Sequence, residues 1–161
     1  MSNNFREIDR GWNRFVREYN RADGAYTKVG FPEKGNFKGE PDNDASTISE
    51  QAQIAIYQEF GTRHIHARPF IRSTMDEEKE EIGRLTDVVI SGALSGNHDI
   101  KKGLGKLGEF AVAKIRNKIT DIKEPGLADS TKRQRRGSGE AANPLVDTGQ
   151  MRQNVQHVEV V

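Results

Sequence analysis

The 161-residue sequence contains no cysteine, which excludes disulfides and metal centres bound through thiolates. It also lacks any apolar run near the ~20 residues that a membrane-spanning helix needs, and residues 1–5 have no signal-peptide character. Hydrophobic residues make up only 34% of the chain. These absences fit a protein of a reducing cytosol without a membrane partner, and they predict a modest core that a partner surface completes.

Neither sign of charge dominates the chain. The 25 basic and 24 acidic residues leave a net charge of +1, so no overall field draws the protein to nucleic acid or to a membrane. The sequence has no glycine-rich phosphate loop and no spacing that argues for a Ser-His-Asp group. We therefore expect a protein that is not an enzyme and that holds no cofactor or metal.

Apolar periodicity and turn residues divide the chain into helices, strands and loops. Two polar stretches, 32–46 and 125–143, are typical of flexible loops. A strand at 155–161 is expected to pair with the strand at 25–31 or with another chain. Helices are expected at 1–24, 47–60, 69–93, 99–122 and 148–153.

The helix at 1–24 has a regular apolar stripe that includes Trp12, Phe15 and Tyr19, with charged residues on its other face. Such stripes usually dock on the protein's own core, and this is the expectation here. The alternative is a helix that associates with another copy or with a partner.

Several residues predict the ends of these helices. Thr47 and Glu50 form a capping box, Gly61 fits a left-handed C-terminal cap, and Pro69 fits a first helical turn. Phe60 falls on the side of its helix that is expected to be buried. Between residues 99 and 122, three glycines predict either close backbone packing or a later helix start.

Two motifs suggest chemistry but lack the necessary context. Residues 147–149 match the Asp-Thr-Gly of aspartic proteases, yet Gln150 and Met151 follow, and too few residues remain for the rest of such an enzyme. We interpret Asp147 as a helix cap. His64 and His66 share one side of an extended segment but have no further ligand nearby in sequence, so they are interpreted as surface histidines.

Residues 132–136 form a basic cluster, KRQRR, within a glycine-flanked stretch. A few such charges can bind phosphates, but no aromatic residue is interleaved to stack on bases. A small nucleic-acid-binding protein that uses this cluster is therefore the alternative function.

Three blocks of sequence resemble the neck and tail-completion (head-tail joining) proteins of long-tailed bacteriophages. The first is 56–62, IYQEFGT, which ends a helix, and the second is 67–72, ARPFIR, which opens a long helix. The third is 127–131, LADST, leading to 144–152, PLVDTGQMR. Their order and spacing fit the family over about residues 48–161, while the first helix and the loop at 32–46 depart from its shortest members.

The resemblance implies a single domain over 1–161 with an α+β fold, in which several helices pack on a small antiparallel sheet. It also implies a structural subunit of the virion, assembled in the bacterial cytoplasm into a ring, hexamer or dodecamer, between head connector and tail. Its partners are further copies, other neck, connector and tail proteins, and transiently the genomic DNA in the channel. The candidate interface or structural residues are Glu59, Phe60, Gly61, Thr62, Arg68, Pro69, Phe70, Arg133, Arg135, Arg136, Leu145, Asp147, Thr148 and Gly149.

Charge suggests one contact between neighbouring copies. The acidic run at 76–81 is usually a solvated face, but in a ring it can meet the basic cluster at 132–136. Strands near Val29 and Val155 offer edges through which a sheet can extend between copies.

Overall fold

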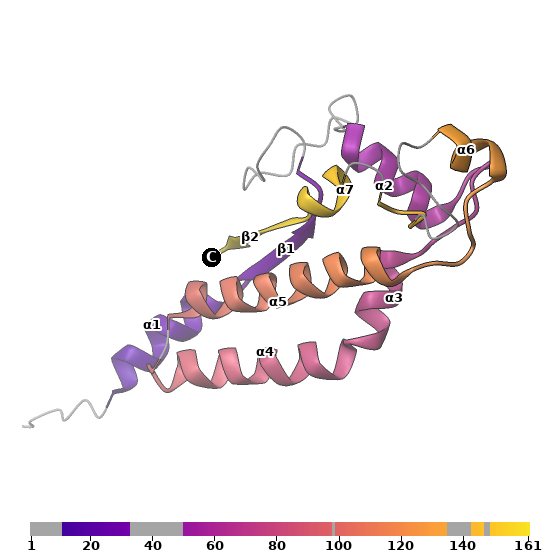
Figure 1. The fold of residues 1–161 in the computed structure, drawn as a ribbon. Coiled ribbons are helices and arrows are strands. Elements are labelled where there is room, and N and C mark those ends of the chain that lie inside the picture. Colours follow the sequence, from indigo (N-terminus) through magenta and orange to yellow (C-terminus); the bar gives the residue numbers. More distant parts are fainter. Residues whose placement is uncertain (1–10, 33–49, 98, 135–142, 147–148) are drawn as a thin grey trace, which may run out of the picture.

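A computed structural model describes residues 11–32, 50–97, 99–134, 143–146 and 149–161. Within them, helices pack on a two-stranded antiparallel sheet, which confirms the α+β prediction (Figure 1). The elements in chain order are α1 (Trp12–Ala22), β1 (Tyr26–Gly30), α2 (Glu50–Phe60), α3 (Phe70–Glu77), α4 (Lys79–Leu94), α5 (Ile100–Asp121), α6 (Asp129–Gln134), α7 (Gln150–Gln153) and β2 (Gln156–Val160).

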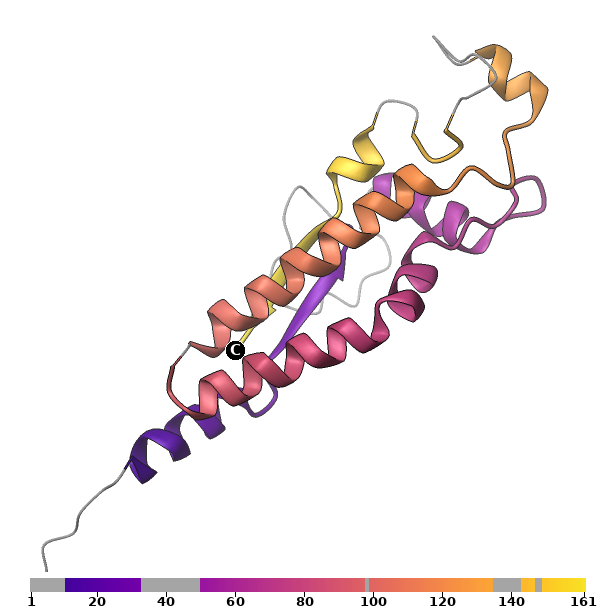
Figure 2. The ribbon, with the colours of Figure 1, turned by 60° about the horizontal axis from the view of Figure 1, so that its bottom comes forward.

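The long helix α5 is the centre of the fold. The sheet lies along one side of it and α4 runs beside it, as two views agree (Figures 1 and 2). Its start was predicted correctly, since the Asp99 carboxylate accepts hydrogen bonds from the amides of Lys101 and Lys102 at 2.8 and 3.3 Å. The buried side of α5 then supplies most of its apolar residues to the core.

Strands β1 and β2 pair with each other, the first of the two alternatives that the sequence leaves open, with Val29 opposite His157 and Tyr26 opposite Val160. Their inner face approaches α5 so closely that a Cβ on Gly108 would lie 2.4 Å from the His157 ring. Likewise, a Cβ on Gly103 would lie 2.5 Å from Val89 of α4. Close packing, and not a later helix start, therefore accounts for these glycines.

The core has two parts. The smaller part, near α1, contains Ala93, Ile100 and Leu104. The larger part lies where α2, α3, α5, α7 and the sheet meet, so it connects segments from most of the described chain. Its buried members are Ala55, Phe70, Val112, Ile115, Ile119, Leu145, Met151 and Val155.

The single helix predicted over 69–93 is wrong, because the chain breaks it into α3 and α4 at Glu78. There the backbone leaves helical geometry, with φ −97° and ψ 8°. The Glu78 carboxylate accepts a hydrogen bond from Lys114 Nζ of α5 at 2.7 Å, and Glu77 pairs with Lys118. Part of the acidic run is thus engaged within the chain.

Other predicted boundaries also change. The stretch 125–143 is not loop throughout, since α6 forms at 129–134. The short helix α7 begins at Gln150 with Gly149 at its N-cap position in a left-handed conformation, φ 79°. The predicted caps Thr47 and Asp147 lie outside the described residues.

Candidate functional site

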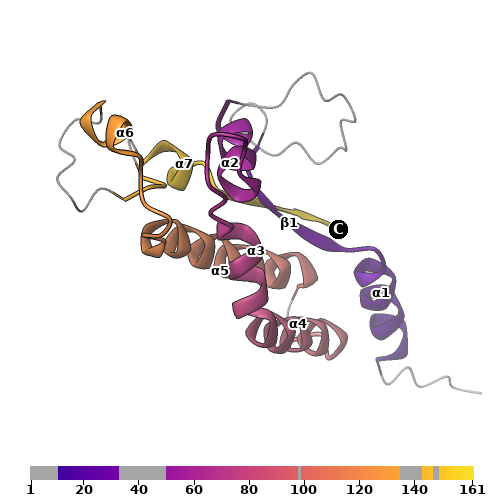
Figure 3. The ribbon, with the colours of Figure 1, turned by 90° about the vertical axis from the view of Figure 1, so that its right-hand side faces the viewer.

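The three blocks that carry the family resemblance meet at one end of the molecule. The end of α2, the start of α3 and the segment 125–126 form what we call the corner, and α7 lies beside α2 (Figure 3). Gln51 of α2 donates a hydrogen bond to the side-chain oxygen of Gln150 in α7 at 3.3 Å. Segments up to 99 residues apart are therefore connected here.

Glu59 connects the first block to the second. Although it is only 3% exposed, its carboxylate accepts hydrogen bonds from the amides of Ile71 and Arg72 at 2.8 and 3.0 Å. These amides open α3, where a helix has unsatisfied donors and a partial positive charge. The Arg72 Nε adds a contact at 3.1 Å, so this buried carboxylate is fully engaged in positioning α3.

Arg68 connects the second block to the first and to the backbone immediately before the third. The residue is 4% exposed, and its guanidinium donates to the backbone oxygens of Pro125 and Gly126, at 2.7 and 2.9 Å. It also donates to the Gln58 side chain at 3.0 Å. A guanidinium presents its donors in a fixed fork, so one side chain fixes three segments together.

The turn between α2 and α3 depends on Gly61, which has φ 75° as predicted. A Cβ at this position would lie 2.9 Å from the backbone of both Ile65 and Ala67, so only glycine fits. The Thr62 hydroxyl accepts hydrogen bonds from the amides of His64 and Ile65 at 3.2 and 3.1 Å. His64 itself is exposed.

Phe70 and Leu145 are both buried in the larger core, and Phe70 has no exposed surface. The Phe70 ring meets Phe31 edge to face at a centroid distance of 6.1 Å. Pro69, which is half-buried, precedes the first turn of α3. Phe70 and Leu145 are therefore structural and are not available to a partner, whereas Pro69 keeps part of its surface exposed.

Phe60 contradicts its predicted burial, because it is 63% exposed. The buried position on that turn of α2 is taken by Glu59, and the Phe60 ring lies on the surface with the Arg72 guanidinium 4.9 Å from its centroid. Further exposed apolar residues on α2 extend this surface. We call it the α2 apolar face; its members are Ile54, Ile56, Tyr57 and Phe60.

The prediction that the first helix docks its stripe on the core is also wrong for the described part. No residue of α1 is buried. Trp12, Phe15 and Tyr19, which we call the α1 aromatic face, stack on one another with ring centroids 5.6 and 6.4 Å apart. Trp12 is 68% exposed.

A groove of about 320 Å³ separates α1 from α4 and α5. Tyr19 belongs both to its lining and to the α1 aromatic face, so the two surfaces are continuous. The other lining residues are mainly apolar, and they include Ala22, Val89, Ile90, Leu94, Leu104 and Leu107.

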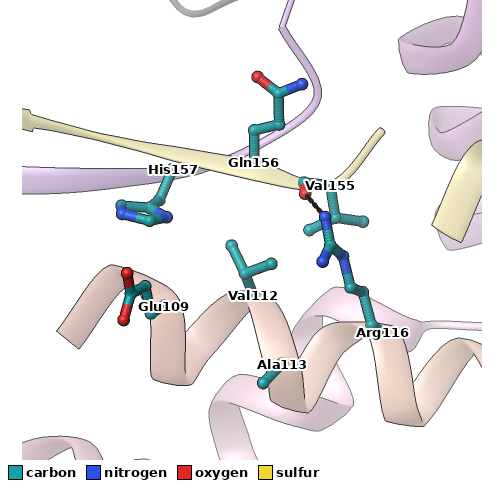
Figure 4. A pocket seen from close by; sticks show the side chains of 7 residues that line it. All are labelled: Glu109, Val112, Ala113, Arg116, Val155, Gln156 and His157. Carbon is teal, nitrogen blue, oxygen red and sulfur yellow. Dashed lines mark hydrogen bonds between the residues drawn. The ribbon is translucent and has the colours of Figure 1, made fainter. Parts of the chain in front are cut away.

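A second hollow, of about 380 Å³, lies between α5 and β2 (Figure 4). It contains Glu109, Arg116 and His157, which sequence reasoning missed because they come from distant segments and match no motif. Arg116 donates to the Val155 oxygen at 2.9 Å, and the His157 Nε2 lies 3.2 Å from the Glu159 carboxylate. Both groups therefore serve the junction of helix and strand.

The basic cluster is described only in part. Lys132 and Arg133 occupy the last turn of α6, where Lys132 lies 3.5 Å from the Asp129 carboxylate and Arg133 is exposed. Arg135 and Arg136, like Asp147 and Thr148, lie outside the described residues. The structure does not bring Arg133 into the corner's hydrogen bonds.

Comparisons with known proteins identify no relative: no family model, no curated protein and no solved structure matches the chain. Within the described ranges, no three His, Asp or Glu side chains are grouped to hold a metal ion. No helix in this part of the chain has the length and apolar character to cross a bilayer. Function is therefore inferred from the corner, the exposed faces and the sequence blocks.

Proposed function

We propose that this protein is a non-enzymatic structural subunit of the neck of a long-tailed phage, forming a ring that joins the head connector to the tail. One observation carries the proposal. The three blocks that resemble the neck and tail-completion proteins pack together: Glu59 bonds the first to the second, and Phe70 of the second shares the larger core with Leu145 and Met151 of the third. Three similar blocks that also pack against one another support the resemblance to these proteins better than three isolated matches would.

The surface of the protein supports a role in contacts. Two apolar faces, one on α1 and one on α2, remain exposed, and such patches are typical of interaction sites. Each strand of the sheet has one partner in the described chain, so the outer edges of β1 and β2 offer a further route for association between copies.

The corner residues divide by accessibility. Glu59, Arg68, Phe70 and Leu145 are buried and shape the subunit. Three others at this end, Phe60, Thr62 and Arg133, are exposed and can meet neighbouring proteins of the neck.

The proposed contact between acidic and basic surfaces now has fewer participants. Because Glu77 and Glu78 pair with lysines of α5, the exposed carboxylates of the acidic run that remain are Asp76 and Glu80. These are the groups we expect to meet Arg133 of a neighbouring copy. An exposed pair of this kind is worth only ~0.2–1 kcal/mol, so it orients the ring more than it stabilises it.

The test is a phage in which the gene for this protein is deleted. We expect electron micrographs of its lysates to show filled heads separate from tails, with joined particles restored by the wild-type gene. A variant with Arg68→Ala should restore them poorly, because the corner loses its connection to residues 125 and 126. Normal joined virions from the deletion phage would contradict the proposal.

The alternative, binding of nucleic acid through residues 132–136, is favoured by the exposed Arg133 on α6. Its test is a gel-shift series over salt concentration, since phosphate contacts weaken steeply as salt rises. Binding at low salt that is lost after charge reversal of Lys132 and Arg133 would support this function. Binding that is unchanged by the reversal would exclude it.

A further inference from the structure

Helix α1 has an aromatic face that no described part of the chain covers. It has 11 residues, none buried, and isolated helices shorter than ~12–15 residues are marginal in water. Its three stacked rings nevertheless form one continuous apolar surface. The helix is therefore expected to become stable when this face is covered.

The α2 apolar face is a matching surface. Helix α2 also has 11 residues, and Tyr57 and Ile56 lie three and four residues before Phe60, the spacings that place side chains on one helix face. These side chains are exposed while the opposite side of α2, with Ala55 and Glu59, is buried. Two helices of equal length thus present apolar faces that the described residues of the chain leave exposed.

The two faces lie at opposite ends of the molecule. Two views place α1 beyond one end of the paired helices α4 and α5, and α2 near the other end (Figures 1 and 2). One copy therefore cannot cover its α1 with its own α2. A contact between different faces of successive copies is heterologous, and it generates a closed ring when the rotation allows.

Charge favours contact between α1 and α2 over contact between two α1 helices. Helix α1 has three arginines, Arg14, Arg17 and Arg21, and one acidic residue, Glu18. Pairing two such helices brings like charges together. Helix α2 has no basic residue and has the exposed carboxylate of Glu50. The Arg72 guanidinium beside Phe60 is already paired with Glu59, so the α2 face opposes α1 with less positive charge than a second α1 would.

We propose that the α1 aromatic face of one copy packs on the α2 apolar face of the next, with Phe60 entering the groove between α1 and α4. This inference rests on the proposed ring function and names the contact that builds the ring. The groove of about 320 Å³ is at the lower end of the ~300–1,000 Å³ found for ligand pockets, a size suited to one large side chain. An aromatic anchor in an apolar recess is the usual centre of an interface.

The test uses two variants of the full chain, Trp12→Asp and Phe60→Asp, and measures mass by sedimentation. We expect the wild type to self-associate, and each variant alone to be monomeric, with association weakened at least about 30-fold as for an interface hot spot. An equimolar mixture should form a dimer and stop there. In the mixture, the unsubstituted α2 face of a Trp12→Asp copy can bind the unsubstituted α1 face of a Phe60→Asp copy. The two faces that remain free in this dimer both contain an aspartate, so no third copy can bind.

Val88→Asp is the matched control, because Val88 is an exposed apolar residue of α4 outside both faces and the groove. It should leave self-association unchanged. Unfolding followed by far-ultraviolet circular dichroism, at concentrations where the wild type is monomeric, should give the same midpoint for each variant and for the wild type. Since Trp12 and Phe60 are exposed in the single chain, a loss of association at an unchanged midpoint identifies a contact between copies.

Three results would overturn the inference. The first is a mixture of the two variants that stays monomeric, and the second is a Val88→Asp control that weakens self-association as much as they do. The third is a wild type that remains monomeric and binds anionic vesicles, where Trp12→Asp abolishes this binding and Phe60→Asp does not. If both the Trp12→Asp and the Phe60→Asp variants still form rings, this contact is wrong but the proposed function remains in place. Normal particles from the deletion phage would reject the function independently of the mixing result.

Discussion

The corner and the α1 end use the same kinds of side chain in opposite ways. At the corner a glutamate and an arginine are buried with their hydrogen bonds satisfied, and an adjacent phenylalanine is exposed. At the other end, three aromatic rings are in solvent while the helix that holds them has no buried residue. The polar side chains of the corner find their partners within one chain, whereas the aromatic face of α1 is left exposed by the described residues.

Because of this difference, the two regions should contribute differently to the stability of the single chain. Substitutions at the corner and along α5 should change the free energy of unfolding of the single chain. Substitutions on α1 should leave it nearly unchanged, because their side chains are already solvated.

The largest effect is expected for Phe70→Ala. Phe70 has no exposed surface and lies in the larger core, so its removal should lower the free energy of unfolding by ~3–5 kcal/mol. The control, Phe60→Ala, should cost less than ~1 kcal/mol, because its ring is on the surface. Urea unfolding of both variants measures the contrast, and equal losses would show that the corner is not packed as described.

Glu59→Gln is expected to cost about 1.5–3 kcal/mol, the usual value for hydrogen bonds to a charged group. The amide retains one acceptor oxygen but opposes the donors of Ile71 and Arg72 with its own NH₂ group. Glu50→Gln, at the exposed start of α2, should change stability by less than ~0.5 kcal/mol. Urea unfolding curves compare the two, and an equally small effect for Glu59 would contradict its role as the cap of α3.

Gly108→Ala and Gly83→Ala should have opposite signs. A Cβ at Gly108 meets the His157 ring and Thr27, so overpacking should cost ~1–3 kcal/mol. At Gly83, on α4, nothing lies within 4 Å, and alanine should stabilise the helix by roughly 0.5–1 kcal/mol. Thermal unfolding measures both shifts. A stabilising Gly108→Ala would mean that the sheet lies farther from α5.

The smallest effect is expected for Trp12→Ala in the monomer. At protein concentrations below self-association, the free energy of unfolding should change by less than ~0.5 kcal/mol, although buried tryptophans cost 3–5 kcal/mol when truncated to alanine. Fluorescence is unsuitable because Trp12 is the single tryptophan, so circular dichroism should follow unfolding. A loss comparable to that of Phe70→Ala would place the α1 face against the core.

The sequence predicts elements well where local rules determine them. Asp99 marks the start of α5, Gly61 marks the end of α2, and alternation and turn residues indicate the two strands, although they leave open whether these pair with each other or with another chain. Each of these features depends on a cap, on a positive φ angle or on periodicity, and all three are encoded within a few residues.

The predictions fail where a distant partner decides the outcome. Apolar periodicity assigned Phe60 to the core, but the core side of α2 accepts Glu59 because the amides of α3, twelve residues on, satisfy its carboxylate. The break at Glu78 has no proline or glycine to mark it. The exposure of α1 is also not encoded locally, since an amphipathic stripe is the same whether its own core or another molecule covers it.

The pairing of β1 with β2 has a consequence for synthesis of the protein. The Thr27 hydroxyl bonds to the carbonyl of Val158, 131 positions farther along the chain. During translation α1 and the first strand leave the ribosome long before their mate, so the inner side of α5 stays uncovered until the last-described strand arrives. A chain that stops before β2 would therefore leave this side of α5 and the edge of β1 exposed to proteases.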